Sequence, residues 1–187
     1  MLAAMFTEIL VFLLNVAAGL VAGLCLLRAY LGWLRVPLGL NSGNPLGPLI
    51  LTVTDPLVLR LRRVLPAGRS VDTASLAAAY AVAVMKLAVL ALLGAAPASP
   101  MVLVWAFFEV LQLILSGLFG LTIVAIILSW VQSYSPMALL VERMVSPLLD
   151  PIRRNLPTLG GLDLSPMVLL LVLQVLDMVL RTLRWSL

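Results

Sequence analysis

Polar and charged side chains stand inside the long apolar stretches of this sequence, and five of them form a candidate site. They are Asn15, Lys86, Glu109, Gln112 and Asp177. A charged group facing lipid costs about 2.5 to 3.5 kcal/mol on insertion scales, so such groups usually face a helical bundle and meet a partner. We expect Lys86 to meet Asp177 or Glu109, and Arg181 is an alternative partner for Asp177 within one helix. A structural ion pair is the favoured interpretation, and a polar route for an ion or proton is the alternative.

A second set of candidate residues lies between the apolar stretches and consists mainly of arginine. Its members are Arg62, Arg63, Arg153, Arg154 and Asp163. Arginines beside a membrane span anchor its orientation, and they also attract anionic lipid. We favour anchoring with anionic-lipid contact over a specific docking site for a protein partner. Asp163 is expected to shape the turn before the last span and to offer its carboxylate to these arginines.

The composition excludes several kinds of active site. The 187 residues include no His and a single Cys, Cys25. A disulfide framework, a Cys/His zinc site, a haem held by His and a nucleophile paired with His are therefore excluded. We expect no enzymatic activity, no metal and no cofactor. The net charge of +4 comes from a few well-placed arginines, so it requires no nucleic-acid partner.

The chain is too apolar to fold as a soluble domain. Hydrophobic residues make up 63% of it and charged residues 11%, with a mean hydropathy of +1.18. Four continuous stretches are long enough to cross a bilayer, at residues 8–33, 75–94, 101–130 and 165–187. Continuous apolar stretches exclude alternating β-spans, and no basic residue precedes Arg28 as a cleaved signal peptide would require. The predicted fold is an all-α membrane protein with four transmembrane helices, the last of them capped by Ser165 and beginning with Pro166.

The distribution of arginine predicts how these spans are oriented. Arginines occur in the two long connections, whereas the connection at residues 95–100 has no charge. The positive-inside rule places both long connections in the cytoplasm and both termini in the periplasm. Proline-started amphipathic pieces at residues 56–65, 136–145 and 147–156 are expected to form short helices in the membrane interface.

The two halves of the chain match each other at a fixed spacing. The string Arg62-Arg63-Val64-Leu65-Pro66 matches Arg153-Arg154-Asn155-Leu156-Pro157, 91 positions later. Nearer the start of each half the offset is 97, because residues 36–43 contain an insertion. A constant offset predicts two repeats, at residues 1–94 and 101–187. Each repeat holds two spans, so the two hairpins share one orientation and lie side by side about a pseudo-symmetry axis.

Small residues occupy equivalent places in the first and third spans. The 97-residue offset pairs Gly19 and Gly23 with Ser116 and Gly120. Spacings of this kind let two helices approach closely. We favour packing of the first span on the third, and a homodimer face is the alternative.

Several strings in the second half carry a family resemblance. They are Trp130, residues 146–157 (SPLLDPIRRNLP), residues 160–166 (GGLDLSP) and residues 173–176 (LQVL). They closely resemble the signature of the YggT (YlmG) membrane-protein family, which the first half matches more loosely. The resemblance implies a two-repeat protein of the bacterial inner membrane. Bacterial members are linked to osmotic and potassium-related stress tolerance and to envelope or division genes, and plastid relatives to cytochrome b6f maturation and nucleoid distribution.

These observations lead to two functional hypotheses. The first is a non-catalytic inner-membrane protein that assembles or organises envelope components through its cytoplasmic face. A membrane-protein partner and anionic lipid are then the expected contacts. The alternative is a small ion channel or transporter in osmotic or potassium homeostasis that uses Lys86, Glu109 and Asp177.

Overall fold

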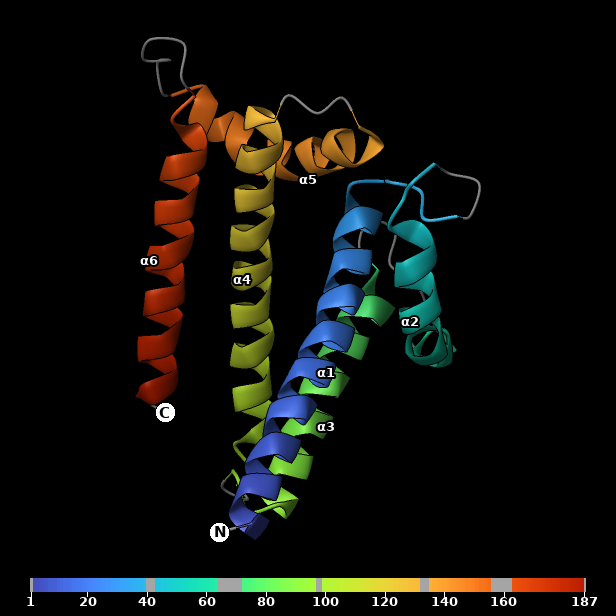
Figure 1. The fold of residues 1–187 in the computed structure, drawn as a ribbon, viewed down its shortest axis with the longest axis vertical. Coiled ribbons are helices and arrows are strands. Elements are labelled where there is room, and N and C mark those ends of the chain that lie inside the picture. Colours follow the sequence, from blue (N-terminus) through green and yellow to red (C-terminus); the bar gives the residue numbers. More distant parts are fainter. Residues whose placement is uncertain are drawn as a thin grey trace. The chain divides into compact units, whose positions relative to one another are not determined.

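The chain folds into six α-helices in a computed structural model, with no strand among the residues that the structure describes. These are residues 2–39, 43–63, 72–96, 99–131, 135–155 and 163–186. The helices are α1 (Leu2–Trp33), α2 (Gly47–Leu61), α3 (Thr73–Leu92), α4 (Val102–Trp130), α5 (Pro136–Arg153) and α6 (Ser165–Trp185) (Figure 1). The all-α prediction is confirmed.

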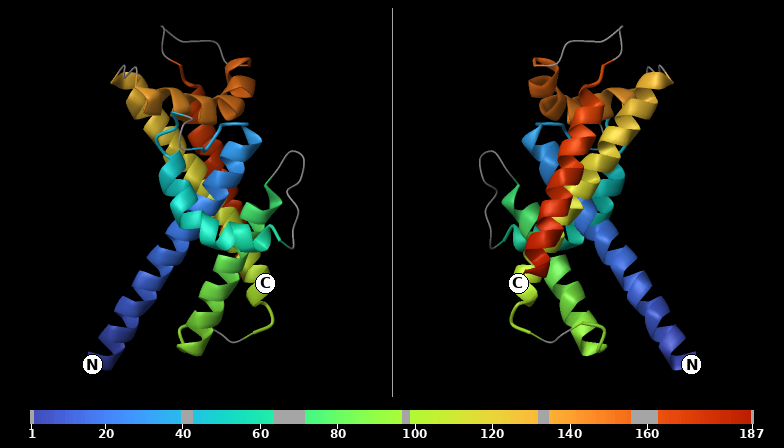
Figure 2. Two further views of the ribbon diagram at one scale, coloured as in Figure 1. Left: turned by 90° about the vertical axis from the view of Figure 1, so that its right-hand side faces the viewer. Right: turned by 90° about the vertical axis from the view of Figure 1, so that its left-hand side faces the viewer.

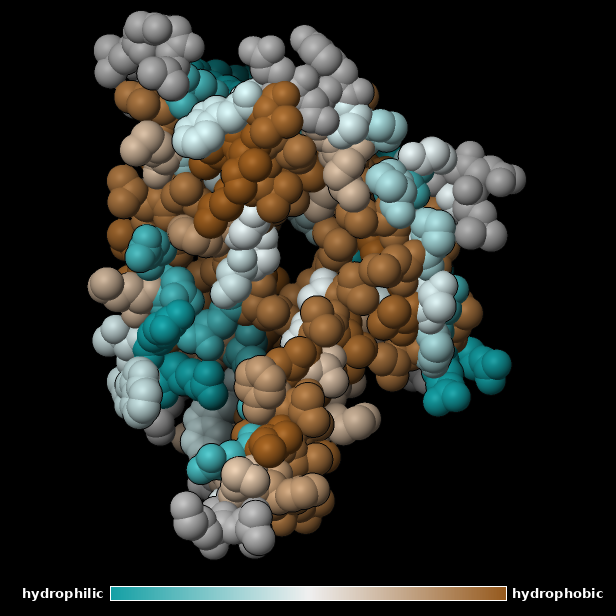
Figure 3. All heavy atoms as spheres, in the orientation of Figure 1, coloured by the Kyte–Doolittle hydropathy of each residue, from teal (hydrophilic) through white to brown (hydrophobic). Residues whose placement is uncertain are grey.

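Four of the helices, α1, α3, α4 and α6, are long and apolar enough to cross a membrane. They expose large apolar side chains such as Phe12, Met85, Phe107 and Leu171. Figure 3 shows apolar residues over much of the surface of these helices. Such surfaces are unfavourable in water and favourable in hydrocarbon. The protein is therefore a multi-pass membrane protein.

The structure comprises two compact units that divide within α4. The first consists of Met1–Leu38 and Leu46–Leu113, and the second of Gly39–Pro45 and Ile114–Leu187. The division falls inside α4 because its first turns pack on α3, whereas its later turns pack on α5 and α6. Compact units are defined by contacts between residues, whereas repeats are defined by matching residues in the sequence. The units therefore do not test the repeats at 1–94 and 101–187, which stay a prediction.

In the first unit, α1 and α3 lie side by side and α2 packs against both (Figures 1 and 2). The buried side of α3 is lined by small residues, including Ala74, Ala78, Ala79 and Ala83. Ala74 with Ala78, and Ala79 with Ala83, are each four residues apart, which places them on one side of the helix. Small side chains on that face let α1 and α2 approach the backbone of α3 closely.

In the second unit, α5 lies across the ends of α4 and α6 (Figure 1). Val141, Val145 and Leu149 of α5 recur at every fourth position and pack with Leu169 and Leu173 of α6. The apolar face of α5 is therefore buried against the protein. Its opposite face carries the charged residues.

The two connecting helices correct the prediction of short pieces bounded by proline. Helix α5 continues through Pro147 and Pro151, and α2 begins at Gly47 and continues through Pro56. An interior proline removes one backbone hydrogen bond and favours a bend, which packing of the buried face can offset. Figure 2 shows α2 changing direction along its length. The predicted ends at residues 64–65 and 156 lie outside the described residues.

The start of α6 also differs from the prediction. Ser165 is the first helical residue rather than the cap, and the N-cap residue Leu164 makes no capping hydrogen bond through its side chain. The backbone N–H of Ser165 instead donates to Asp163 Oδ1 at 2.9 Å. A carboxylate satisfies an unpaired donor at a helix start and also suits the helix dipole, so Asp163 performs the role assigned to Ser165.

Candidate functional site

Lys86 and Glu109 form an ion pair inside the first unit. Lys86 Nζ of α3 contacts Glu109 Oε1 of α4, and their side chains are 11% and 24% exposed. Close by in sequence, the Tyr80 hydroxyl donates to the Leu103 carbonyl at 3.0 Å and joins the same two helices. Of the two partners that the sequence left open for Lys86, the structure places Glu109 beside it. The pairing offsets the cost of holding each charge between apolar helices.

Asp177 finds its partner within its own helix. Arg181 Nε, one turn later in α6, donates to Asp177 Oδ2 at 2.7 Å. The other carboxylate oxygen, Oδ1, is buried and has no hydrogen-bond partner in the described part of the chain. Figure 3 shows hydrophilic residues gathered over the C-terminal half of α6. The pair that the sequence offered as the alternative for Asp177 is thus the one formed.

The two neutral members of the predicted polar set are placed differently. The side-chain amide of Asn15 donates to the Val11 carbonyl of the same helix at 2.9 Å. Gln112 lies half-buried on α4. Within the described residues, Asn15 and Asp177 bond to groups of their own helices. The pair of Lys86 with Glu109 instead joins two helices, α3 and α4.

A buried arginine of α1 was missed in the sequence analysis. The Arg28 side chain is 6% exposed, and its Nη1 donates to Asp55 Oδ1 at 2.6 Å and to Thr54 Oγ1 at 2.7 Å. Its Nε lies 3.8 Å from Asp72 Oδ2, just before α3. One guanidinium group thus contacts α2 and the start of α3. The signal was present: Arg28 precedes the end of the first span by five residues, where an arginine needs a partner.

Asp72 extends this network to the end of α2. Its Oδ2 accepts hydrogen bonds from Arg62 Nη2 at 2.7 Å and from Ser75 Oγ at 2.8 Å. Burial by itself raises the pKa of Asp72, but the hydrogen bonds from Ser75 and Arg62 and the charge of Arg62 outweigh it and lower the pKa below its usual value of 3.8. The carboxylate is therefore ionised at neutral pH and caps α3.

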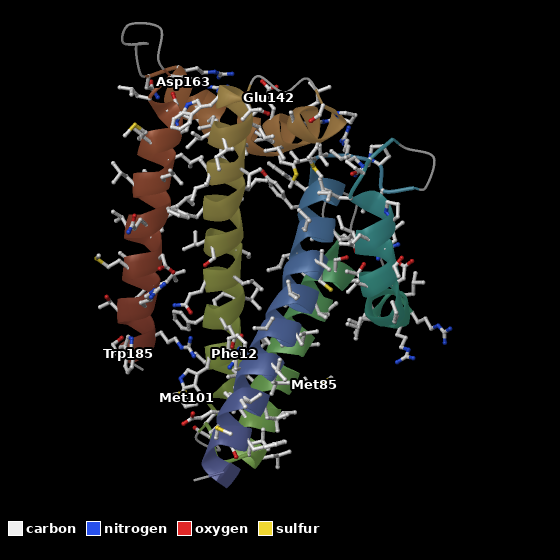
Figure 4. All side chains as sticks on the ribbon, viewed as in Figure 1. Phe12, Met85, Met101, Glu142, Asp163 and Trp185 are labelled. Atoms are coloured by element: carbon white, nitrogen blue, oxygen red, sulfur yellow. The ribbon has the colours of Figure 1, made fainter. Side chains whose placement is uncertain are left out.

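The second unit contains an equivalent contact. Arg153 Nε donates to Asp163 Oδ2 at 2.7 Å, at the start of α6 (Figure 4). Burial by itself raises the pKa of Asp163, but the hydrogen bonds from Ser165 and Arg153 and the charge of Arg153 lower it below 3.8 overall. Each unit therefore ties an arginine near the end of a connecting helix to the aspartate that precedes the next span. The remaining predicted arginines, Arg63 and Arg154, are exposed.

The predicted small-residue faces are open within their own units. Apart from its chain neighbours and the nearby backbone of its own helix, a methyl group placed on Gly19, Gly23 or Gly120 would meet no described atom of its unit within 4 Å. Ser116 is exposed. Packing between the first and third spans and a homodimer both stay predictions.

With this geometry established, comparison with known proteins identifies the family. The CCB3/YggT family model matches residues 7–93 and 104–184. The chain belongs to the CCB3/YggT family. It is 36% identical over 170 residues to a protein of Escherichia coli (strain K12) described as uncharacterized protein YggT, covering 90% of this chain and 87% of that protein. It is 37% identical over 173 residues to the Pseudomonas aeruginosa protein PA0392, covering 90% and 86%.

A more distant relative extends the comparison to another bacterium. A protein of Haemophilus influenzae is 31% identical over 153 residues, covering 81% of this chain and 80% of that protein. No solved structure matches the chain. The YggT resemblance seen in the sequence is confirmed.

Proposed function

We propose that this protein is a non-catalytic protein of the bacterial inner membrane that assembles or organises envelope components through its cytoplasmic face, with a role in osmotic stress tolerance. The pairing of its charged side chains supports this proposal most. Arg28, Arg62, Lys86 and Arg153 each pair with an acidic side chain on another segment. Charges engaged in this way join helices to one another, as in a structural scaffold.

The outer face of α5 is the best-formed surface for a partner. Glu142, Arg143 and Asp150 are exposed on it, while Val145 and its neighbours bury the opposite face. Burial of the apolar face holds the helix in place, so the exposed charges are presented on a rigid element. A fixed pattern of both signs favours selective recognition of a complementary surface.

The proposed orientation rests on arginine and tryptophan. Both long connections carry arginines and are assigned to the cytoplasm, which leaves both termini in the periplasm. Trp33 and Trp130 are 50% and 77% exposed, each at the end of a span that precedes a connecting helix. Tryptophan at such positions is typical of the boundary between lipid and water. The two matching halves are proposed to be repeats with the same orientation.

Crosslinking in native membranes followed by purification in mild detergent tests the proposal. We expect a reproducible complex that is lost when Glu142 and Arg143 are both changed to Ala. Leu139→Ala is the matched control, because Leu139 is 63% exposed on the same helix but uncharged. Recovery of the folded chain without any specific protein partner would count against an organising role. A reporter fused at Ala98 should report a periplasmic location.

A transport function is the second candidate, and one observation favours it. The spans contain the pair of Lys86 with Glu109 and a buried oxygen of Asp177 that has no hydrogen-bond partner among the residues that the structure describes. Ionisable groups inside spans often mark ion or proton pathways. Potassium or proton flux in proteoliposomes, abolished by Lys86→Ala and unchanged by Thr182→Ala, would favour transport over the organising role.

A further inference from the structure

In each of the two arginine pairs, one member bonds to an aspartate and, within the described part of the chain, the other does not. Arg62 and Arg153 each donate to an aspartate at 2.7 Å. Arg63 and Arg154, the next residues in the chain, are exposed, and their side chains have no partner among the residues that the structure describes. The same division therefore occurs at the end of α2 and at the end of α5.

The aspartates show where the exposed arginines lie along the spans. Asp72 caps α3, and Asp163 accepts the backbone N–H of the first residue of α6. Both helices are candidate membrane spans. Arg63 and Arg154 each directly follow the arginine that binds one of these aspartates. They are therefore held near the end of a span. This is the level at which lipid headgroups lie.

Among the described residues, the acidic side chains near Arg63 and Arg154 are engaged by other groups. Asp72 is occupied by Arg62 and Ser75, and Asp163 by Arg153 and the start of α6. Asp150, the remaining acid near the end of α5, lies 4.0 Å from Arg153 and is itself half-exposed.

Two further features bear on which anion the exposed arginines bind. Arg60, one turn before Arg63, is exposed as well. A guanidinium group free of carboxylates presents several N–H donors in the planar arrangement that fits phosphate oxygens.

We propose that Arg63 and Arg154 bind the phosphate groups of anionic lipid headgroups, whereas Arg62 and Arg153 hold the helix ends in place. The inference rests on the proposed function for its orientation, in which these helix ends face the cytoplasmic leaflet. Anionic lipid fits both sites because each offers one or two exposed cations at the end of a span. Basic residues at this level are attracted to anionic headgroups.

Lipid titration of the purified full-length protein tests this division. The chain is kept in a neutral detergent and titrated with short-chain phosphatidylglycerol, with phosphatidylcholine or with inorganic phosphate, and binding is followed by tryptophan fluorescence. We expect saturable binding of phosphatidylglycerol alone. The variant with Arg63→Gln and Arg154→Gln should keep its lipid-free Tm, while its Kd rises about fivefold for each arginine removed.

The matched control changes the other member of each pair. The variant with Arg62→Gln and Arg153→Gln should have a lower lipid-free Tm and a Kd for phosphatidylglycerol within about twofold of the parent protein. If it does not fold, Arg62→Lys with Arg153→Lys replaces it, with the same expected Kd. An unchanged Kd in the first variant, or an equal loss in the control, would overturn the inference. Equal binding of inorganic phosphate or phosphatidylcholine would overturn it too.

A second crosslinking experiment separates a failure of the lipid-binding inference from a failure of the proposed organising function. Crosslinking is repeated on the variant with Arg63→Gln and Arg154→Gln. A complex that disappears while phosphatidylglycerol binding is unchanged would show that these arginines serve a protein partner, and the lipid inference would fail. Lost lipid binding with an intact complex supports it. Normal lipid binding with no complex in the parent protein would contradict the organising function alone.

Discussion

The two connecting helices, α2 and α5, both bury an apolar face but differ in chemistry at its centre. In the first unit, the buried Arg28 bonds to Thr54 and Asp55 of α2. The sequence offsets pair these residues with Ala125, Val145 and Ser146. Val145 belongs to the apolar core beneath α5, and Ala125 packs against that core. A polar network at one site therefore corresponds to hydrophobic packing at the other.

What the two regions share is the contact from arginine to aspartate. Arg62 with Asp72 and Arg153 with Asp163 have the same 2.7 Å separation and the same place before a span. A buried ion pair adds little net stability over well-packed apolar residues, although losing one partner is costly. Both halves therefore have the same geometry at this contact, although the residues that pack beneath the two connecting helices differ in polarity.

A backbone contact shows a second difference. A methyl group on Gly47 would lie 2.5 Å from the Leu38 carbonyl oxygen. Its counterpart at the 91-residue offset is Ala138, which already carries that methyl group. Leu38 belongs to the segment 36–43 that has no match in the second half. The added segment in the first half of the sequence includes Leu38, whose carbonyl group leaves room at residue 47 for glycine alone.

The largest expected effect comes from removing the buried cation. Arg28→Met should destabilise the protein by about 3 kcal/mol or more, because it leaves Asp55 and Thr54 without their donor. The measurement is the Tm and the free energy of unfolding in detergent micelles. Arg28→Lys is the control and should lose less, since it keeps the charge. A Tm within experimental error of the parent value would show that the polar network does not hold α2.

Copying the chemistry of the second unit should sharpen the same comparison. Adding Asp55→Ser to Arg28→Met places the second-half residue opposite an apolar side chain and removes the unpaired carboxylate. We expect at least half of the lost stability to return, because removing both partners avoids an uncompensated charge. Strictly additive losses in the Tm would show that the two residues do not interact.

The membrane ion pairs provide the next comparison. Lys86→Met should cost about 3 kcal/mol, because Glu109 is left charged among apolar helices, and adding Glu109→Gln should restore part of it. The equivalent change in the second half, Asp177→Asn, should cost about 1 kcal/mol, since it breaks a contact within one helix whose Arg181 is largely exposed. Unfolding of all three variants under matched detergent conditions measures this, and equal costs would contradict the comparison.

A smaller effect is expected at the glycine. Gly47→Ala should lower stability by about 2 kcal/mol, because the added methyl group requires the backbone near Leu38 to shift. Ala138→Gly in the second unit should cost about 1 kcal/mol through helix propensity alone. Shortening the segment 36–43 should make Gly47→Ala better tolerated, and an unchanged penalty would place the strain elsewhere.

The smallest effect concerns pH. Asp72 and Asp163 both have a lowered pKa, so the stability they add is complete above their usual pKa of 3.8 and is lost as pH falls through the lowered value. Tm should therefore fall on acidification from about pH 5 to about pH 3. Asp72→Asn should remove more of this dependence than Asp163→Asn, because Asp72 is 11% exposed and Asp163 35%. Identical pH profiles for both variants would contradict that ranking.

The sequence was sufficient for features that depend on many residues at once. The four spans were predicted because about twenty consecutive apolar residues are needed to cross a bilayer and are unlike a soluble sequence. The family followed from strings around Arg153 and Asp163. The contact between these two residues was also expected, since they flank a single short connection.

Single pairings were harder to predict. Lys86 had two acidic residues at suitable depth, and sequence distance does not show which one shares its face of the bundle. Arg28 was missed because Thr54 and Asp55 lie 26 and 27 residues away on another helix. Proline rules also failed for α2 and α5, because the packing of a buried face outweighs the hydrogen bond that each interior proline removes.

The sequence alone determined that this protein lies in a lipid bilayer and how many spans it has, because hydrophobicity and length are sums over local residues. The tertiary structure decided which charges meet, and that the buried Arg28 contacts α2 at a place where apolar side chains pack beneath α5. These choices depend on distances between segments far apart in the chain. Such distances are set by how whole helix faces fit together, which no local pattern encodes.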